Sequence, residues 1–203
     1  MLRGYPRNCS RSIRAIEQRL AALEGPSVRL RFVPELTAGR GRLYSGRAFG
    51  HPVHAGSFIR KREIVLDREL ERQPKELARI LVHELFHFAW VRLGNQRRRS
   101  FEALLREEWE RGARGELGWS AEWRKRAILK RAIDAAGAGN PEDSGSLAGS
   151  AAWREYLCES FCDTGAWIYS GVRRHPEYTL AARHRDRRAE WFRGAFQARR
   201  ILI

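Results

Sequence analysis

Two histidines and a glutamate lie together in the segment 77–90, which reads LARILVHELFHFAW. His83 and His87 are four residues apart, so on an α-helix they lie on one face, one turn above the other. Two imidazoles at this spacing can bind one metal ion. Glu84 follows His83 by about 100° of helix rotation, so its carboxylate can reach a water on that metal without binding the metal itself. The pattern therefore predicts a zinc site with a base beside it.

A catalytic zinc ion takes three protein ligands and keeps one position for water, so a third ligand must come from elsewhere in the chain. The preferred candidate is Glu159, 72 residues after His87. Glu159 begins a Glu-x-x-x-Asp pattern on a predicted helix. Asp163, one turn later, can accept a hydrogen bond from the outer N–H of a liganding histidine and so orient the ring. Glu155, one turn before Glu159, is the rival third ligand.

Cys158 and Cys162 allow a different interpretation of the same region. With the two histidines they would complete a closed His₂Cys₂ site, which holds zinc structurally and leaves no position for a substrate. On a helix, however, each cysteine lies about 100° from the acidic residue that follows it, so the two sets cannot all face one metal. Cysteine is also among the most frequently buried residue types. We therefore interpret both as core thiols.

Together, His83-Glu84-x-x-His87 and Glu159-x-x-x-Asp163 resemble the motifs of the gluzincin zinc metallopeptidases, which include the thermolysin-like enzymes. The separation of the two motifs is longer than in thermolysin-like enzymes. It is closer to that in the membrane proteases that process CAAX proteins, although this chain lacks their membrane helices. The resemblance covers about residues 59–93 and 152–171. It implies a zincin-like fold and hydrolysis of peptide bonds, with zinc as cofactor and a peptide or protein as substrate.

The resemblance also implies a role for each residue of the two motifs. His83, His87 and Glu159 would bind zinc. Glu84 would be the general base, which takes a proton from the zinc-bound water and later passes it to the leaving amine. Asp163 would orient a liganding histidine.

Two further features are expected by the same resemblance. The strand at 64–66, just before the central helix, would be the edge strand that holds an extended substrate. An oxyanion donor, usually a histidine or tyrosine, is also expected. We prefer His175, because it lies in a loop after the second ligand helix, before Pro176. The other candidates are Tyr156, Tyr169 and Tyr178.

The hydrophobic pattern predicts the elements that position these residues. Apolar and basic residues alternate over 28–33, as in a half-buried strand, and a second strand is predicted over 58–67. Pro74 suits the first turn of the central helix, and Gly94 stops that helix. Further helices are predicted over 10–24, 100–114, 120–136, 151–169 and 178–203, and a Gly- and Ser-rich loop over 137–150.

These elements predict one α+β domain over residues 1–203. A small, mostly antiparallel sheet over about 26–70 would pack on a helical body over about 74–203, which carries the metal-binding helix. A chain of 203 residues with 43 % hydrophobic residues is long enough to bury a sizeable core.

The composition bounds the cellular setting. Three cysteines, an odd and sparse set, do not indicate a disulfide framework. The first twelve residues hold three arginines and no apolar run, unlike a secretory signal, and no apolar run reaches the roughly 18 to 20 residues of a membrane helix. We therefore expect a soluble, cytoplasmic protein.

The net charge of +15 supports an alternative function. Most of the positive charge is arginine, which attracts nucleic acid but also accumulates in chains encoded by GC-rich genomes. The alternative is a non-enzymatic nucleic-acid-binding protein with a structural zinc site. Its non-specific contacts would come from an Arg-rich surface that includes Arg185, Arg187 and Arg188.

Overall fold

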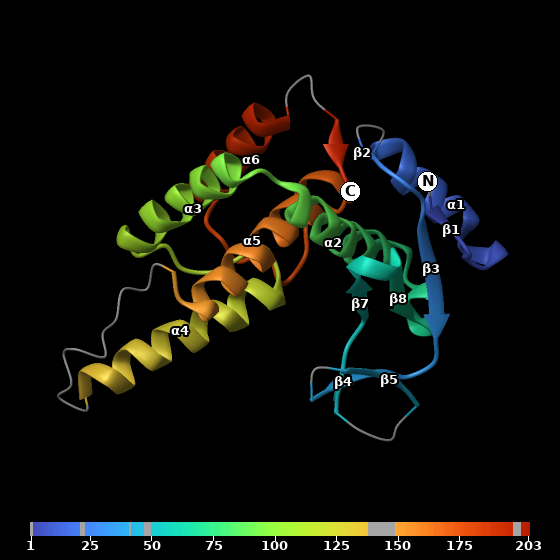
Figure 1. The fold of residues 1–203 in the computed structure, drawn as a ribbon, viewed down its shortest axis with the longest axis horizontal. Coiled ribbons are helices and arrows are strands. Elements are labelled where there is room, and N and C mark those ends of the chain that lie inside the picture. The colour runs from blue at the N-terminus through green and yellow to red at the C-terminus, as the bar shows by residue number, and fades with distance from the viewer. Residues whose placement is uncertain (1, 21–22, 41, 47–49, 138–148, 197–199) are drawn as a thin grey trace. The chain divides into compact units, whose positions relative to one another are not determined.

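A computed structural model describes residues 2–20, 23–40, 42–46, 50–137, 149–196 and 200–203 (Figure 1). The chain forms two compact units. The first unit contains residues 1–93, 165–173 and 196–203, and the second contains residues 94–164 and 174–195. Most of the predicted loop at 137–150 lies outside the described residues, and the single domain stays a prediction.

The main sheet of the first unit has the strand order β1-β3-β8-β7. Its strands are β1 (Leu2–Arg3), β3 (Val28–Val33), β7 (Ala55–Phe58) and β8 (Glu63–Asp67). The pairs β1–β3 and β3–β8 are parallel, and only β7–β8 is antiparallel. Our prediction of a mostly antiparallel sheet is therefore wrong for this sheet, although the strand pairs within residues 36–52 are antiparallel. Parallel pairing of β3 and β8 needs a long crossover, and the described residues of 34–62 supply it without an α-helix.

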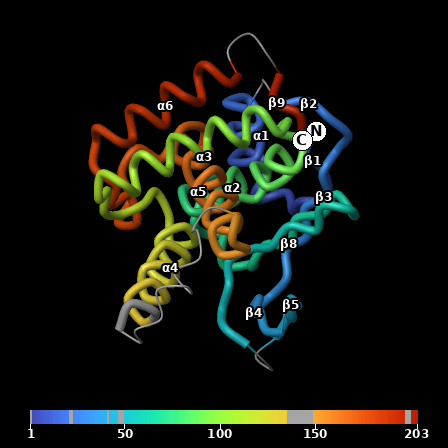
Figure 2. Tube along the Cα trace, turned by 60° about the vertical axis from the view of Figure 1, so that its left-hand side comes forward, coloured from blue at the N-terminus to red at the C-terminus, as the bar shows by residue number. Residues whose placement is uncertain are grey.

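That crossover builds a second small sheet in the order β5-β4-β6, from β4 (Leu36–Gly39), β5 (Arg42–Ser45) and β6 (His51–Pro52). Figures 1 and 2 show β4 and β5 beyond the end of β8. An apolar cluster joins this sheet to one face of the main sheet. Its members are Val33, Leu36, Leu43, Val53, Phe58 and Val65.

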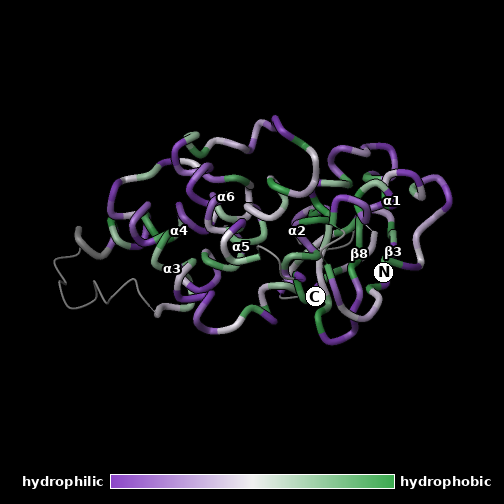
Figure 3. The backbone as a smooth tube through the Cα atoms, turned by 90° about the horizontal axis from the view of Figure 1, so that it is seen from above, coloured by the Kyte–Doolittle hydropathy of each residue, from purple (hydrophilic) through white to green (hydrophobic). Residues whose placement is uncertain are grey.

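The predicted edge strand lies inside the sheet. β8 contains Ile64–Leu66 and is flanked by β3 and β7, and all five of its residues are buried. Figure 3 colours most of β8 as hydrophobic. The prediction that this strand forms the edge is therefore wrong, because a continuous apolar run is typical of a strand covered on both faces. Among the described residues, the edge strand on that side is β7.

Both ends of the chain differ from the predicted helices. The first helix, α1 (Ser10–Arg19), is followed by β2 (Leu23–Glu24), and the last residues form β9 (Ile201–Leu202). β2 and β9 pair in parallel, with Leu23 opposite Ile201. Helices over 10–24 and 178–203 are therefore too long as predicted. Their ends form strands because β2 and β9 pair with each other across the chain. Such long-range pairing cannot be predicted from local hydrophobic periodicity.

The central helix α2 (Pro74–Arg92) begins and ends where the sequence predicts. Pro74 occupies the first turn, where a missing N–H costs no hydrogen bond. The middle of the helix is buried nearly all round, through Leu81, Val82, Leu85 and Phe86. Short 3₁₀ turns lie at Arg7–Cys9, Ile59–Lys61 and Arg68–Arg72.

The second unit is built from helices. They are α3 (Asn95–Glu110), α4 (Trp119–Gly137), most of α5 (Ala151–Tyr169) and α6 (Ala182–Phe196). α4 and α5 lie within one residue of their predicted ranges. α3 begins and ends earlier in the chain than predicted, and α6 is shorter than predicted at both ends. An aromatic core joins α3, α5 and α6 through Phe101, Phe161 and Phe192. None of the helices in the described residues combines the length and apolar character needed to cross a bilayer.

Candidate metal centre

The helix α2 presents two imidazoles on one face. The ring centroids of His83 and His87 lie 4.9 Å apart, with the ring planes inclined by 78°. His83 is 8 % exposed, and His87 is half-buried. His83 is therefore buried, whereas His87 stays partly accessible to solvent. The two rings lie on one face of the helix, as the four-residue spacing predicts.

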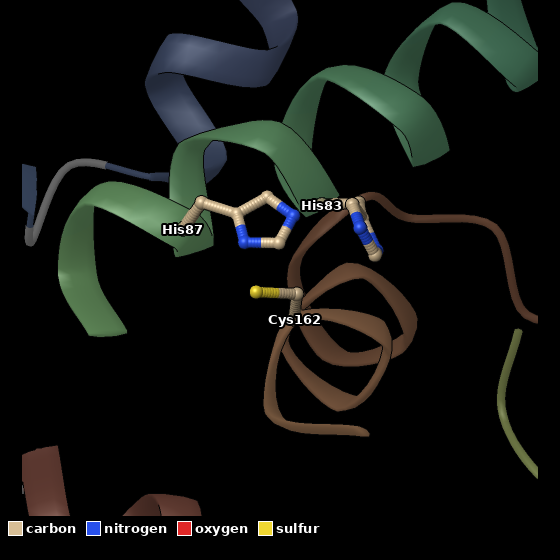
Figure 4. A group of neighbouring side chains, drawn as sticks. All are labelled: His83, His87 and Cys162. Carbon is tan, nitrogen blue, oxygen red and sulfur yellow. The ribbon is translucent and has the colours of Figure 1, made fainter. Parts of the chain in front are cut away.

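A thiol completes the group that can hold a metal ion. One ligand atom each from His83, His87 and Cys162 lies within 4.8 Å of the other two. Figure 4 shows the two rings on successive turns of α2 and the side chain of Cys162, from α5, beside them. Two imidazole nitrogens and one sulfur are a donor set that zinc accepts, and three protein ligands leave a fourth position open. The donor set therefore fits zinc.

The end of α5 packs on α2 within the first unit. The rings of Phe86 and Tyr169 stack with centroids 5.5 Å apart. A Cβ at Gly165 would lie 2.5 Å from the Phe86 ring, so only a glycine fits there. Cys162 lies on the turn of the same continuous helix that precedes Gly165. The close approach at Gly165 thus fixes how the end of α5 packs on α2 within the first unit.

We predict Cys162 to be a core thiol, and the structure also makes it a candidate metal ligand. It is fully buried, as expected, but it also belongs to the group around the two histidines. The spacing contains a signal for this. Cys162 follows Glu159 by three residues, and residues three apart on a helix are neighbours on its surface. The interpretation of Cys162 as a core thiol considers only its angle to Asp163 and not its position beside Glu159 on the helix.

Burial raises the pKa of the Cys162 thiol well above its ordinary value, and a hydrogen bond with the Cys158 thiol raises it further. The nearby charges of Glu159 and Asp163 act in the same direction. A neutral thiol is a poor metal ligand, whereas a bound cation favours the thiolate. Metal binding by Cys162 would therefore release a proton.

Glu159, the predicted third ligand, is not part of that group of three. Its carboxylate oxygen Oε1 lies 3.3 Å from the Arg124 guanidinium, which also lies 3.7 Å from Glu155. Glu155 is largely exposed. Metal binding by Glu159 or by its rival Glu155 stays a prediction.

Asp163 has a role that the sequence did not reveal. Its Oδ2 accepts a hydrogen bond from the backbone N–H of Ala121, at 3.2 Å, in the first turn of α4. A Cβ at Gly118 would lie 2.3 Å from the Asp163 carboxylate, so this carboxylate occupies the space of a capping side chain at position 118. An acid at a helix N-terminus satisfies an otherwise unpaired N–H and interacts favourably with the helix dipole. Its orientation of a liganding histidine stays a prediction.

Glu84 lies in the turn between the two histidines and is 7 % exposed. The Ser57 hydroxyl, on β7, lies 2.6 Å from Glu84 Oε2. In the described part of the chain, no arginine or lysine forms an ion pair with Glu84. Other buried glutamates differ, since Glu63 pairs with Arg31 and Glu116 pairs with Arg188.

The oxyanion candidates separate into different environments. The Tyr156 hydroxyl is buried and donates to Glu116 Oε1 at 2.6 Å, so it serves a buried polar network. Tyr169 stacks on Phe86. His175 Nδ1 accepts a hydrogen bond from the backbone N–H of Glu177 at 3.3 Å. The proposed catalytic role of His175 stays a prediction.

Comparisons with models of protein families, with curated proteins and with solved structures found no match for this chain.

Proposed function

We propose that this chain is a zinc-dependent peptidase. His83, His87 and a donor from α5 hold the metal, and Glu84 is the general base. Cys162 is the α5 donor that lies within reach of both imidazoles, and Glu159 is the predicted alternative. Bound zinc supplies Lewis-acid polarisation and lowers the pKa of water to about 7.

The observation that carries this proposal is the environment of Glu84. A buried carboxylate without a cationic partner is unfavourable, and proteins retain such groups mainly at functional sites. Glu84 has a neutral hydroxyl as its hydrogen-bond partner, while two imidazoles on the same helix flank it in sequence. A divalent cation at those imidazoles would supply the missing positive charge. A base beside a metal ion is also the arrangement that hydrolysis needs.

Residues of the first unit would transfer the proton and bind the substrate. The Glu84 carboxylate accepts a proton from the attacking water and later donates it to the leaving amine, so the base is regenerated in each turnover. Among the described residues, β7 pairs with β8 on one side only. Its other side offers backbone groups to which an extended peptide can bind as an added strand. The expected substrate is therefore a peptide or an unfolded segment of a protein.

The test combines metal analysis with one substitution. Protein purified without chelators is expected to contain about one zinc per chain, and it should cleave fluorescein-labelled casein. Glu84→Gln keeps the shape of the side chain but removes its basicity, so it should retain zinc and lose hydrolysis. Glu107→Gln, an exposed acid on α3, is the matched control and should behave as the unchanged protein. Metal-free protein, or full hydrolysis by Glu84→Gln, would overturn the proposal.

One observation favours the alternative of a structural metal site. The Cys158 thiol is hydrogen-bonded to Cys162, so a second sulfur lies next to the group of three ligands. Four protein ligands would close the site. Cys158→Ala separates the two cases. It should greatly weaken zinc binding in a closed His₂Cys₂ site and leave zinc binding nearly unchanged in the catalytic site.

The alternative function of nucleic-acid binding includes Arg188 in the exposed basic surface, and this placement is wrong. Arg188 is fully buried and paired with Glu108 and Glu116, so it does not belong to an exposed basic surface. Arg187 lies 2.6 Å from Glu107. Binding to nucleic acid that falls steeply with salt would still support this function.

A further inference from the structure

Strand β7 presents Ser57 toward the central helix. Successive side chains of a strand point to opposite faces. A Cβ at Gly56 would lie 2.5 Å from the Leu43 side chain of the small sheet, so position 56 faces that sheet. Ser57 therefore faces the other way, and its hydroxyl reaches Glu84 on α2. A hydrogen bond therefore joins the edge strand β7 to Glu84, the predicted base.

The hydroxyl of Ser57 lies between two oxygen atoms of the same residue. It is 2.6 Å from the carboxylate atom Oε2 of Glu84 and 3.0 Å from the backbone carbonyl oxygen of Glu84. A serine hydroxyl has one hydrogen to donate and two lone pairs that accept. At any moment it can donate to only one of the two oxygens. The shorter contact is the one expected for a hydroxyl donating to a carboxylate.

The contact with Ser57 engages one oxygen of the Glu84 carboxylate, Oε2, and leaves the other, Oε1, for a second partner. A base that takes a proton through Oε1 still accepts the Ser57 hydrogen bond at Oε2. The carboxyl group therefore keeps a hydrogen-bond partner both before and after it accepts a proton.

We propose that Ser57 is a positioning residue for Glu84, which fixes the carboxyl group through Oε2 and leaves Oε1 for the water. This inference rests on the proposed function of Glu84 as the base. It adds a residue that lies in no metal-binding motif, 27 residues before Glu84 in the chain. The contact also makes the orientation of the base depend on the edge strand.

A matched pair of substitutions isolates the hydroxyl group. Threonine and valine have nearly the same shape, and both suit a strand, but only threonine keeps the hydroxyl. We expect Ser57→Val to lower kcat for a quenched fluorescent peptide about 10- to 100-fold, as a misplaced catalytic group does, with KM changed less than about twofold. Ser57→Thr should restore most of kcat. Ser45→Ala removes an exposed hydroxyl that donates to the Pro34 carbonyl, and it serves as the control.

Two measurements separate positioning from a loss of structure. Zinc content and the melting temperature should be nearly equal for Ser57→Thr and Ser57→Val. Crystal structures should show one orientation of the Glu84 carboxyl group in the unchanged protein and in Ser57→Thr, and a displaced or split orientation in Ser57→Val. Equal kcat for the two variants, with one carboxyl orientation in both, would overturn the inference.

The failure of the proposed function has a different signature. If the unchanged, zinc-loaded protein cleaves neither casein nor the peptide, the peptidase assignment fails. The crystal structures still decide whether Ser57 positions Glu84. If the unchanged protein is active and Ser57→Val is equally active, only the positioning role fails.

Discussion

The guanidinium group of Arg188 and the carboxylate of Glu116 lie 2.8 Å apart in the interior of the second unit, and neither side chain is exposed to solvent. Arg188, on α6, also pairs with Glu108 of α3 at 2.7 Å. Lys125 of α4 lies 3.0 Å from Glu116, and Tyr156 of α5 donates to it. This buried network, with two acidic and two basic side chains, connects α3, α4, α5 and α6.

Loss of Arg188 should strongly destabilise the second unit. Arg188→Met fits an apolar side chain into the interior but leaves two buried carboxylates without their main cation. Removing one partner of a buried ion pair typically costs about 3–5 kcal/mol of unfolding free energy. Urea unfolding followed by circular dichroism measures this change. Arg187→Met, which breaks a partly exposed pair with Glu107, should cost less than about 1 kcal/mol. Similar losses for both variants would contradict the network.

The same network predicts loss of stability in acid. Burial opposes ionisation of Glu116, but the charges of Arg188 and Lys125 outweigh it and lower the pKa of Glu116 from 4.5 to about 2. Because the folded pKa is depressed, the stabilisation is present above the unfolded pKa and is lost as the pH falls toward the folded one. The free energy of unfolding should therefore decrease from about pH 5 to about pH 2. Glu116→Gln should show a shallower decrease over that range, and an equally steep one would count against this assignment.

Glycine is required at position 118 but not at position 194. Gly118→Ala would place a methyl group against the Asp163 carboxylate and disturb the start of α4, at a cost of about 1–3 kcal/mol. A methyl group at Gly194, in α6, would point into open space, with no neighbouring atom within 4 Å. Gly194→Ala should therefore stabilise the protein by about 0.5–1 kcal/mol, because alanine favours a helix. Thermal unfolding of the two variants is expected to shift in opposite directions.

The third metal ligand can be identified from zinc affinity. Cys162→Ala should weaken zinc binding by more than about 100-fold, which exceeds the usual loss for residues that only support a ligand. Glu159→Gln should leave zinc binding within about 10-fold. Competition with a chromogenic chelator measures both affinities. The reverse order would identify Glu159 as the ligand, as the resemblance to gluzincins implies.

Local patterns in the sequence were sufficient for several elements. The bounds of α2 and α5 follow from apolar periodicity with Pro74 at one helix start and glycines after both helices. The placement of His83 and His87 on one face follows from helix geometry alone. Strand β3 follows from the alternation of apolar and basic residues. In each case the deciding interactions join residues only a few positions apart.

Only the tertiary structure decided which distant residues meet. The parallel pairs of the main sheet, the strand at the C-terminal end and the burial of Arg188 all depend on partners far away in the chain. The same holds for the candidate site. The sequence determined that α2 offers two imidazoles and a carboxylate. The tertiary structure brought Cys162 to the imidazoles and Ser57 to Glu84, because side-chain contacts between elements depend on how the backbones pack, as at Gly165.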